Sequence, residues 1–291
     1  MIMDLRKLEH LIGVAEEGSI TRAAERLHLS QQALSTSIRT LEREVGVDLL
    51  DRSGPLPTVL PAGHALIADA RVLHGLSRSA VQRARRIGRG EPETLRIGHT
   101  PAVTSEEITT LLRRIHPQHP ELGPQINQRY PHELTEQLLA GDLELGLCRA
   151  MTPAHGLTRG TVTHHRLRIA VAAEHHLAER DSVQLRELVE ETFMVWGTPG
   201  RSGYTELLVQ HCRHAGFEPA VHRNPIQGTP PVTAVLGTDH LAFVTTSPGS
   251  AADGQVRVLE LRPPHHVPLH ALWAPHTTSH ARDTFLAAAA E

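Results

Sequence analysis

The segment Ile20–Arg52, with the sequence ITRAAERLHLSQQALSTSIRTLEREVGVDLLDR, decides how the first part of the chain folds. Ser19 and Ser30 each precede a run of residues with helical spacing, and serine is a common N-cap in that place. The apolar residues that recur on one face are Ala23, Ala24 and Leu27 in the first run and Leu34, Ile38, Leu41 and Val45 in the second. Because only a short turn separates the runs, the pattern predicts helices over 20–27 and 31–45 that form a helix-turn-helix.

The sequence on either side completes a small domain. Asp4 precedes another amphipathic run, so we predict a helix over 5–17 that ends at Gly18. After the second helix of the helix-turn-helix, two short apolar runs flank Ser53-Gly54-Pro55, which predicts a small hairpin that forms a wing. Residues 1–60 are therefore predicted to form a winged helix-turn-helix domain.

A long helix is predicted from Pro61 to about Gly88, within a linker segment of residues 61–90. Small and apolar residues recur along it at alternating spacings of four and three. They are Leu66, Ala70, Leu73, Ser77, Ala80, Ala84 and Ile87. A stripe this narrow suits a partner helix, so we interpret the segment as a dimerisation helix. The alternative is that the stripe packs against its own domain.

The charge of the chain is unevenly distributed. The 291 residues include 29 Lys and Arg against 32 Asp and Glu, a net charge of −3. The linker segment is nevertheless basic, because six arginines accompany a single acid, Asp69. These arginines are Arg71, Arg78, Arg83, Arg85, Arg86 and Arg89. The distribution permits nucleic-acid binding but does not by itself establish it.

The outward face of the predicted 31–45 helix carries short hydrogen-bonding side chains and no charge in its first two turns. These side chains are Gln31, Gln32, Ser35 and Thr36, and Arg39 and Arg43 follow them. Gln can pair with adenine, and Ser and Thr can meet several base edges in the major groove. The N-terminus of the helix also favours a nearby phosphate. The face is therefore a candidate for reading DNA, and the alternative is a solvated polar face on a small helical bundle.

A spaced set of residues between 21 and 63 closely resembles the winged helix-turn-helix signature of LysR-type transcriptional regulators. The set is Thr21, Ala23, Ala24, Leu27, Ser30, Gln31, Ala33, Ser35, Ile38, Leu41, Glu42, Val45, Gly46, Leu49, Leu50 and Arg52, followed by Pro61-Ala62-Gly63. The resemblance implies a homodimer through the 62–88 helix, a homotetramer through the body, and two recognition helices that read a dyad-related site. With the helix-face pattern, it gives the predicted DNA-binding residues Thr21, Arg22, Ser30, Gln31, Gln32, Ser35, Thr36, Arg39, Arg43 and Arg52.

The chain departs from the family pattern at several of these positions. Gln32 stands where the family usually has Pro, Thr36 where a basic residue is common, and Leu50 where Phe is usual. Pro55-Leu56-Pro57 occupies the part of the wing in which the family has basic residues. Fewer ion pairs with phosphate should give a shallower dependence of DNA affinity on salt than is usual for such proteins.

Past residue 91, predicted strands and helices alternate, which indicates an α/β fold with a parallel sheet. The predicted strands are 94–98, 125–130, 143–148, 168–173, 193–196, 220–222, 241–245, 256–261 and 268–274. The predicted helices are 105–115, 133–140, 185–190, 204–215, 231–236 and 279–290. This effector-binding domain, residues 91–291, resembles the family's two-lobed sensor, which is like a periplasmic binding protein. Lobe I is expected over about 91–160 and 265–291, and lobe II over about 161–264.

Open α/β sheets bind ligands beyond the carboxyl ends of their strands, so the residues that follow each predicted strand are candidates for a small-molecule site. Hydroxyls and a helix N-terminus after the first strand, and a cation after the third, would suit an anionic or small polar effector. The predicted effector-binding residues are Thr100, Pro101, Thr104, Arg149, Gly197, Thr198, Gln227 and Thr229. In the family, residues that match Thr100, Thr198 and Thr229 tend to line the cleft between lobes. The alternative for any one of them is a helix cap or a loop hydroxyl.

Nothing in the sequence indicates an enzyme, a metal site or a cofactor. The chain has 22 His, often in pairs such as His175/His176, but it lacks His-Glu-x-x-His, Cys-x-x-Cys, Gly-x-Ser-x-Gly, a phosphate loop and a dinucleotide fingerprint. We therefore predict no catalytic residues, no metal and no cofactor. Cys148 and Cys212 cannot form a disulfide scaffold; we expect Cys148 to be a buried core residue, and Cys212, on a helix, to be buried or partly exposed. A redox switch would require them to meet across the lobes.

The pattern and the resemblance together predict a cytoplasmic, sequence-specific transcriptional regulator with no membrane segment. Its partners would be double-stranded operator DNA, a small-molecule effector and further copies of itself, and the resemblance allows RNA polymerase as well. Effector binding would change the oligomer geometry and thereby the spacing of the DNA-binding domains. The alternative is a solute-binding or enzymatic α/β protein with an incidental helical N-terminus, which would need an export signal or convergent catalytic groups.

Overall fold

In this computed structural model, the N-terminal winged helix-turn-helix domain, which we call the head, contains the helices α1 (Leu5–Glu17), α2 (Ile20–Arg26) and α3 (Gln31–Val45). Capping side chains and glycines fix the ends of these helices. The model describes residues 4–226 and 228–290. Asp4, Ser19 and Ser30 accept hydrogen bonds from backbone N–H groups of α1, α2 and α3. Gly18 and Gly46 adopt left-handed conformations that end α1 and α3. The predicted helix-turn-helix is confirmed.

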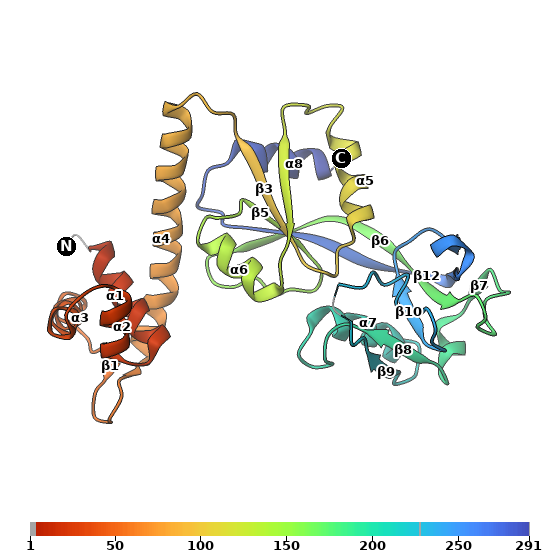
Figure 1. The fold of residues 1–291 in the computed structure, drawn as a ribbon, viewed down its shortest axis with the longest axis horizontal. Helices are drawn as coiled ribbons and strands as arrows, with labels where there is room; N and C mark the ends of the chain where they lie inside the picture. The colour runs from red at the N-terminus through yellow and green to blue at the C-terminus, as the bar shows by residue number, and fades with distance from the viewer. Residues whose placement is uncertain (1–3, 227, 291) are drawn as a thin grey trace.

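The wing and the linker helix follow as predicted. The wing is the antiparallel pair β1 (Leu50–Asp51) and β2 (Thr58–Val59), and the linker is the long helix α4 (Pro61–Gly88). Figure 1 shows α4 standing between the head and the α/β body. Gly63 allows this arrangement, because a Cβ there would collide with the carbonyl oxygen of Leu49.

The body is built on a single mixed sheet. Its strands run in the order β4-β3-β5-β12-β6-β10-β8-β9, and the short strands β7 and β11 both pair with β12. The body strands are β3 (Thr94–His99), β4 (Gly123–Gln128), β5 (Leu145–Cys148), β6 (Thr158–Ala172), β7 (Ser182–Val183), β8 (Thr192–Val195), β9 (Ala220–Arg223), β10 (Leu241–Val244), β11 (Gly249–Ala251) and β12 (Val256–Trp273). The body helices are α5 (Ser105–Ile115), α6 (Pro131–Leu139), α7 (Gly203–His214) and α8 (His280–Ala290), with 3₁₀ turns at Leu185–Leu188 and Ala252–Gly254.

The α/β fold is confirmed, but the sheet is mixed, whereas the alternation of strands and helices predicted a parallel sheet. Strands β4-β3-β5 and β10-β8-β9 are parallel groups, but β6 and β12 pair antiparallel with each other over most of their length and join the two groups. The predicted strands 256–261 and 268–274 are parts of β12, and the predicted 168–173 strand is only the end of β6. Because β6 and β12 cross both lobes, neither lobe has a sheet of its own.

Two apolar cores show where one lobe gives way to the other. Val162, Leu269 and Ala271 belong to the core beneath α5 and α8, which we call the lobe I core. Leu167 and Val267 belong to the core that contains Phe193 and Phe243, which we call the lobe II core. The change from one core to the other therefore occurs within β6 and within β12. The lobe boundaries that the sequence predicted remain predictions.

Two predicted helices of lobe II are wrong or incomplete. Residues 231–236 form turns, in which the carbonyl of Pro230 accepts from the N–H groups of Thr233 and Ala234. The predicted 185–190 helix is only a 3₁₀ turn over Leu185–Leu188. Each segment offers fewer than two helical turns, so its conformation is decided by tertiary packing and not by the local sequence.

Candidate DNA-binding face and effector cleft

Helix α3 lies on the side of the head away from the body (Figure 1). Gln31, Gln32 and Thr36 are exposed, and Ser35 is half-buried between them. Ser30 is exposed, but its hydroxyl is occupied as the cap of α3, accepting from the N–H of Ala33 at 3.1 Å. The first two turns of α3 therefore present an accessible, uncharged hydrogen-bonding surface, as the sequence indicated.

The other predicted contacts on α2 and α3 are also accessible. Thr21, Arg22, Arg39 and Arg43 are all exposed. Arg22 donates to the carbonyl oxygen of Glu17, and Arg43 donates to the hydroxyl of Thr40 at 3.0 Å. Arg39 has no side-chain partner among the described residues, which leaves its guanidinium available to a phosphate.

Arg52 has a different role from the one predicted. Its guanidinium forms a two-point ion pair with Glu42, with Nη1–Oε1 at 3.1 Å and Nη2–Oε2 at 2.9 Å. Oε1 of Glu42 also accepts from the backbone N–H groups of Leu49 and Leu50. Burial acts to raise the pKa of Glu42, but the hydrogen bonds from Arg52, Leu49 and Leu50 hold it below its usual value. Arg52 therefore fastens the start of the wing to α3 instead of serving as a free phosphate contact.

The apolar stripe of α4 has a buried part and an exposed part. Its first part packs inside the head, where Ala70 is fully buried and Leu66 is half-buried. Beyond that point the stripe is open, and Leu73 and Ile87 are 43% and 67% exposed. Packing against the same chain thus accounts for the beginning of the stripe and leaves the rest without cover among the described residues.

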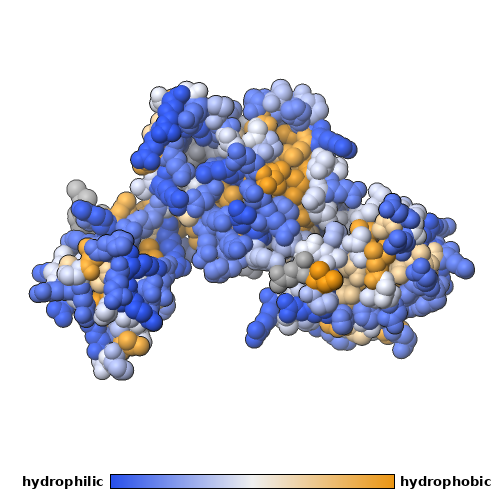
Figure 2. All heavy atoms as spheres, in the orientation of Figure 1, coloured by the Kyte–Doolittle hydropathy of each residue, from blue (hydrophilic) through white to orange (hydrophobic). Residues whose placement is uncertain are grey.

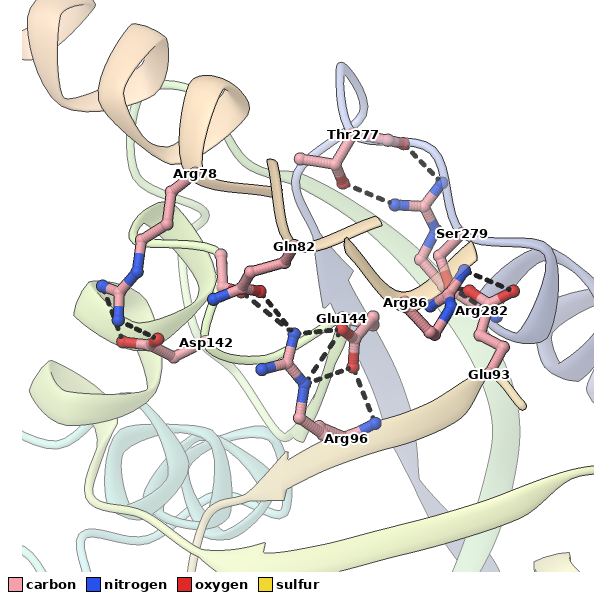
Figure 3. Close-up of polar contacts among 11 residues, drawn as sticks. Arg78, Gln82, Arg86, Glu93, Arg96, Asp142, Glu144, Thr277, Ser279 and Arg282 are labelled. Carbon is pink, nitrogen blue, oxygen red and sulfur yellow. Dashed lines mark hydrogen bonds and ion pairs between the residues drawn. The ribbon is translucent and has the colours of Figure 1, made fainter. Parts of the chain in front are cut away.

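Polar side chains fasten the other side of α4 to lobe I (Figure 3). Arg78 pairs with Asp142 at 2.8 Å, and Arg86 pairs with Glu93 at 3.5 Å. A Cβ on Gly75 would collide with the carbonyl oxygen of Leu139, so α4 and α6 are nearly in backbone contact. These contacts fix the direction of the linker helix relative to lobe I.

A cleft of about 240 Å³ lies between the lobes, beyond the carboxyl ends of β3 and β10. Pro101 and Thr104 of the predicted set line it from lobe I, and Thr229 lines it from lobe II. The other lining residues are His99, Ala102, Val103, Ser105, Glu106, Gln128, Trp196, Tyr204, Gly228, Pro230, Pro231, Val232, Phe243, Val244, Thr245 and Thr246. Of the lobe II wall that extends from Tyr204 to Thr246, the predicted set contains only Thr229. In the sequence, the apolar residues of this wall cannot be distinguished from ordinary core residues.

Arg149 does not line the cleft. Its side chain has no exposed surface, and its two terminal nitrogens bind Glu107 at 2.6 and 3.1 Å. Burial acts to raise the pKa of Glu107, but the charge and hydrogen bonds of Arg149 hold it below its usual value. The Arg149 guanidinium lies 5.9 Å from the centre of the Tyr204 ring, and Thr245 helps to lower the pKa of Glu107, so the pair connects the lobes beneath the cleft. Arg149 is therefore bound by Glu107 and is not a free cation for the effector, contrary to the prediction.

The remaining predicted effector residues lie outside the cleft lining. Thr100 is 3% exposed, and its hydroxyl has no partner among the described residues. Gly197 exchanges hydrogen bonds with the Thr205 hydroxyl, and the Thr198 carbonyl accepts from Arg201 and Ser202, so both residues form the turn that leads into α7. Gln227 falls outside the described residues.

Cys148 and Cys212 are buried in separate cores, so the structure gives no support to a redox switch between them. Burial raises the pKa of each thiol to about 12, which keeps both protonated at neutral pH.

Among the described residues, His175, His176 and Glu191 lie close enough to share a metal. However, the N–H of Leu177 donates to Nδ1 of His175, which leaves the ring proton on Nε2, the atom that faces Glu191. In that tautomer Nε2 has no lone pair for a metal. The group therefore forms close His–Glu contacts, in which Nε2 of His175 and Nε2 of His176 lie 3.6 and 3.1 Å from the Glu191 carboxylate.

A winged helix-turn-helix, an exposed linker stripe and a two-lobed body with a cleft define the class: a DNA-binding regulator with a ligand-binding body. The model of the bacterial regulatory helix-turn-helix proteins of the lysR family matches residues 5–64, and the model of the LysR substrate binding domain matches residues 88–291. The chain belongs to the LysR family of transcriptional regulators.

Individual relatives agree with this assignment. The chain is 32% identical over 225 residues to the HTH-type transcriptional regulator TfdS of Cupriavidus pinatubonensis, which covers 75% of this chain and 74% of the relative. It is 32% identical over 198 residues to the uncharacterized regulator YnfL of Escherichia coli, covering 67% and 66%.

Solved structures show the same fold over the full length of the chain. The crystal structure of CbnR, a LysR family transcriptional regulator, superposes with a TM-score of 0.60 and 24% identity, covering 99% of this chain and 100% of CbnR. Full-length CbnR complexed with its target DNA superposes with a TM-score of 0.62 and 23% identity, covering 99% of both chains. In the described part of this chain, no helix has the length and apolarity needed to cross a membrane.

Proposed function

We propose that this protein controls transcription by reading operator DNA with the exposed face of α3 and by responding to a small molecule held in the cleft between its lobes. The observation that carries the proposal is the accessible, uncharged start of α3 in a winged helix-turn-helix. Gln31, Gln32 and Thr36 offer donors and acceptors that base edges in the major groove can satisfy. The protein would act in the cytoplasm as a binding protein and not as an enzyme.

A band shift with DNA from upstream of the protein's own gene tests this role. Gln31→Ala and Thr36→Ala should each cost about 1–3 kcal/mol of discrimination at one base pair, because each removes a base contact. Gln118→Ala, on the exposed surface of the body, is the matched control and should leave binding unchanged. Unchanged operator preference in both α3 variants would refute the assignment of this face.

The exposed part of the α4 stripe supports a dimer through the linker helix. Leu73 and Ile87 are open on a helix whose other side is bound to lobe I, so a partner α4 would cover them. Two recognition helices would then reach a dyad-related site. Leu73→Glu together with Ile87→Glu should convert dimers to monomers in sedimentation velocity, whereas Arg85→Glu, on the exposed surface beside the stripe, should not.

An apolar surface on lobe I supports a second contact between bodies, and thus a tetramer. Figure 2 shows a hydrophobic patch on this lobe. A groove there of about 370 Å³ is lined by Leu112, Pro117 and Pro124, together with the buried side chains of Ile115, Leu122 and Phe285. Large apolar patches on a protein surface commonly mark interfaces. Effector binding would then change the packing of the bodies and the spacing of the heads, which requires a different effector affinity in each assembly.

A further inference from the structure

The chemistry of the cleft indicates the class of effector that it accepts. This inference rests on the proposed role of the cleft as the effector site. Three features near the cleft could attract a carboxylate: the guanidinium of Arg149, the N-terminus of α5 and the hydroxyl of Thr100. Each must be free and accessible to do so.

Arg149 is not free. Its terminal nitrogens bind both oxygens of Glu107, and Nη1 also donates to the carbonyl oxygen of Ala102 at 2.6 Å. The pair is buried and has no net charge. Nη2 also lies 2.7 Å from Nδ1 of His165, and Nε, which has no partner among the described residues, is fully buried. An effector carboxylate could reach the terminal nitrogens only by displacing Glu107, which would leave that carboxylate buried without its arginine.

The N-terminus of α5 is also partly occupied, with only the N–H groups of Ser105 and Glu106 unpaired among the hydrogen bonds of the described residues. Thr104 and Glu107 form a capping box, in which the Thr104 N–H donates to Glu107 at 2.9 Å and the Glu107 N–H donates to the Thr104 hydroxyl at 3.3 Å. Glu106 adds a second carboxylate to the same first turn. The partial positive charge of the helix end is therefore already met by the protein's own acids.

Two of the groups that line the cleft are acceptors, and the hydroxyl and amide side chains beside them, such as Ser105, Gln128 and Thr229, can either donate or accept. Glu106 is exposed at the cleft and has no ion pair within residues 4–226 and 228–290. Nδ1 of His99 faces the carbonyl oxygens of Thr100 and Val103 at 3.2 and 3.1 Å, so Nδ1 carries the ring proton and Nε2 is an acceptor in the neutral ring. No Arg or Lys lines the cleft in the described part of the chain.

The walls around these acceptors are apolar and fixed. Pro101 faces Trp196, Pro231 and Val232 across the cleft. The indole N–H of Trp196 donates to the carbonyl oxygen of Thr229 at 3.2 Å, which holds the ring in place. A cavity of about 240 Å³ is small beside the roughly 300–1,000 Å³ of drug-sized sites. The ligand is therefore a small molecule with an apolar body.

We propose that the cleft selects a small amine with an aromatic or aliphatic body, held by Glu106 and His99, and that it rejects the corresponding carboxylate. The hydrogen-bond donors of an amine match the acceptors of the cleft, and its positive charge matches Glu106. The flat apolar walls would hold the body, and the Trp196 ring would also favour a cation. The expectation of an anionic effector is thereby replaced.

Isothermal titration of the full chain with benzylamine, benzyl alcohol and benzoate tests the proposal, because the three probes share a ring and differ in the head group. Benzylamine should bind about tenfold more tightly than benzoate. Glu106→Gln should weaken benzylamine about tenfold and leave benzyl alcohol unchanged. Glu179→Gln, an exposed acid elsewhere in lobe II, is the matched control and should bind like the wild type.

The other outcomes overturn the proposal. Benzoate binding as tightly as benzylamine would do so, and so would a failure of all three probes to bind. Val232→Trp, which fills the cleft, should abolish binding while the thermal unfolding profile stays cooperative; retained binding would place the amine elsewhere. A band shift on the same preparation separates this inference from the proposed function. Operator binding without amine selectivity would refute only the inferred effector class. Amine selectivity without operator binding would refute only the proposed DNA-binding role.

Discussion

The wing of the head and the floor of the cleft each contain an arginine that follows a short strand, and in each the arginine is bound by a glutamate from a helix. Arg52 and its partner Glu42 lie at the edge of the head, where the arginine side chain is 32% exposed. Arg149 and its partner Glu107 are almost completely buried. The same pairing therefore fastens a surface hairpin in one region and connects two lobes in the other. The comparison shows that an arginine near a predicted site is not free for a ligand until its own partners are known.

The largest effect is expected when the buried pair is broken. Arg149→Ala leaves the Glu107 carboxylate buried without its partner, which should cost about 3–5 kcal/mol in the free energy of unfolding. Urea denaturation of the full chain, followed on the body transition, measures this. Replacing both partners together, as Arg149→Met with Glu107→Leu, should cost less than the single change, because no buried charge is left. A single variant within 1 kcal/mol of the wild type would contradict the described pairing.

The pH dependence of stability should distinguish the two regions next. Glu42 and Glu107 both have pKa values below the usual range in the folded protein. Each therefore contributes stability that is present above the unfolded-state pKa of about 4.3 and is lost as the pH falls toward the folded-state pKa. Glu107→Gln should lower the melting temperature at pH 7, and its difference from the wild type should shrink as the pH approaches 3.

Glu42→Gln should show the same trend with a smaller amplitude, because its pair is partly solvated and therefore weaker. Thermal unfolding from pH 3 to pH 7 provides the measurement. Glu179→Gln should follow the wild-type curve at every pH. A Glu107→Gln difference that grows on acidification would reverse the sign expected for a carboxylate with a lowered pKa.

The smallest effect concerns salt. Because Arg52 is bound to Glu42, Arg52→Ala should weaken operator binding through a looser wing while leaving the slope of log affinity against log salt unchanged. Arg39→Ala removes an exposed guanidinium without a side-chain partner, so it should reduce that slope by about 1. Band shifts across a salt series compare them. A lower slope for Arg52→Ala would restore its predicted phosphate contact.

Local signals in the sequence accounted well for the head. Asp4, Ser19 and Ser30 cap the three helices, and Gly18 and Gly46 end two of them, so each boundary is set by a residue within a few positions of it. The stripe on α4 was visible for the same reason. Only its division between the head and the open surface depended on contacts that the spacing does not contain.

The fold of the body was less predictable because it depends on pairing between strands that lie far apart in the sequence. The first half of β6, around Gly160 and His164, lacks the alternation of a strand and is held by its partner β12. The cleft shows the same limit. Pro101, Thr104 and Thr229 could be found from their positions after strands, but Tyr204, Phe243 and Val232 reach the cleft only through the packing of lobe II. The ion pair of Arg149 with Glu107, 42 positions away in the chain, could not be predicted from the local sequence.

The continuity of β6 and β12 has a practical consequence for dissecting this protein. Each lobe core draws on a different half of the same two strands, so a truncation that isolates either lobe would cut both strands and expose the interior of the other. Both lobes therefore belong to one sheet, whereas the strands of the head pair only with each other. Crystallisation fragments and domain swaps with other regulators should therefore keep everything after the linker together.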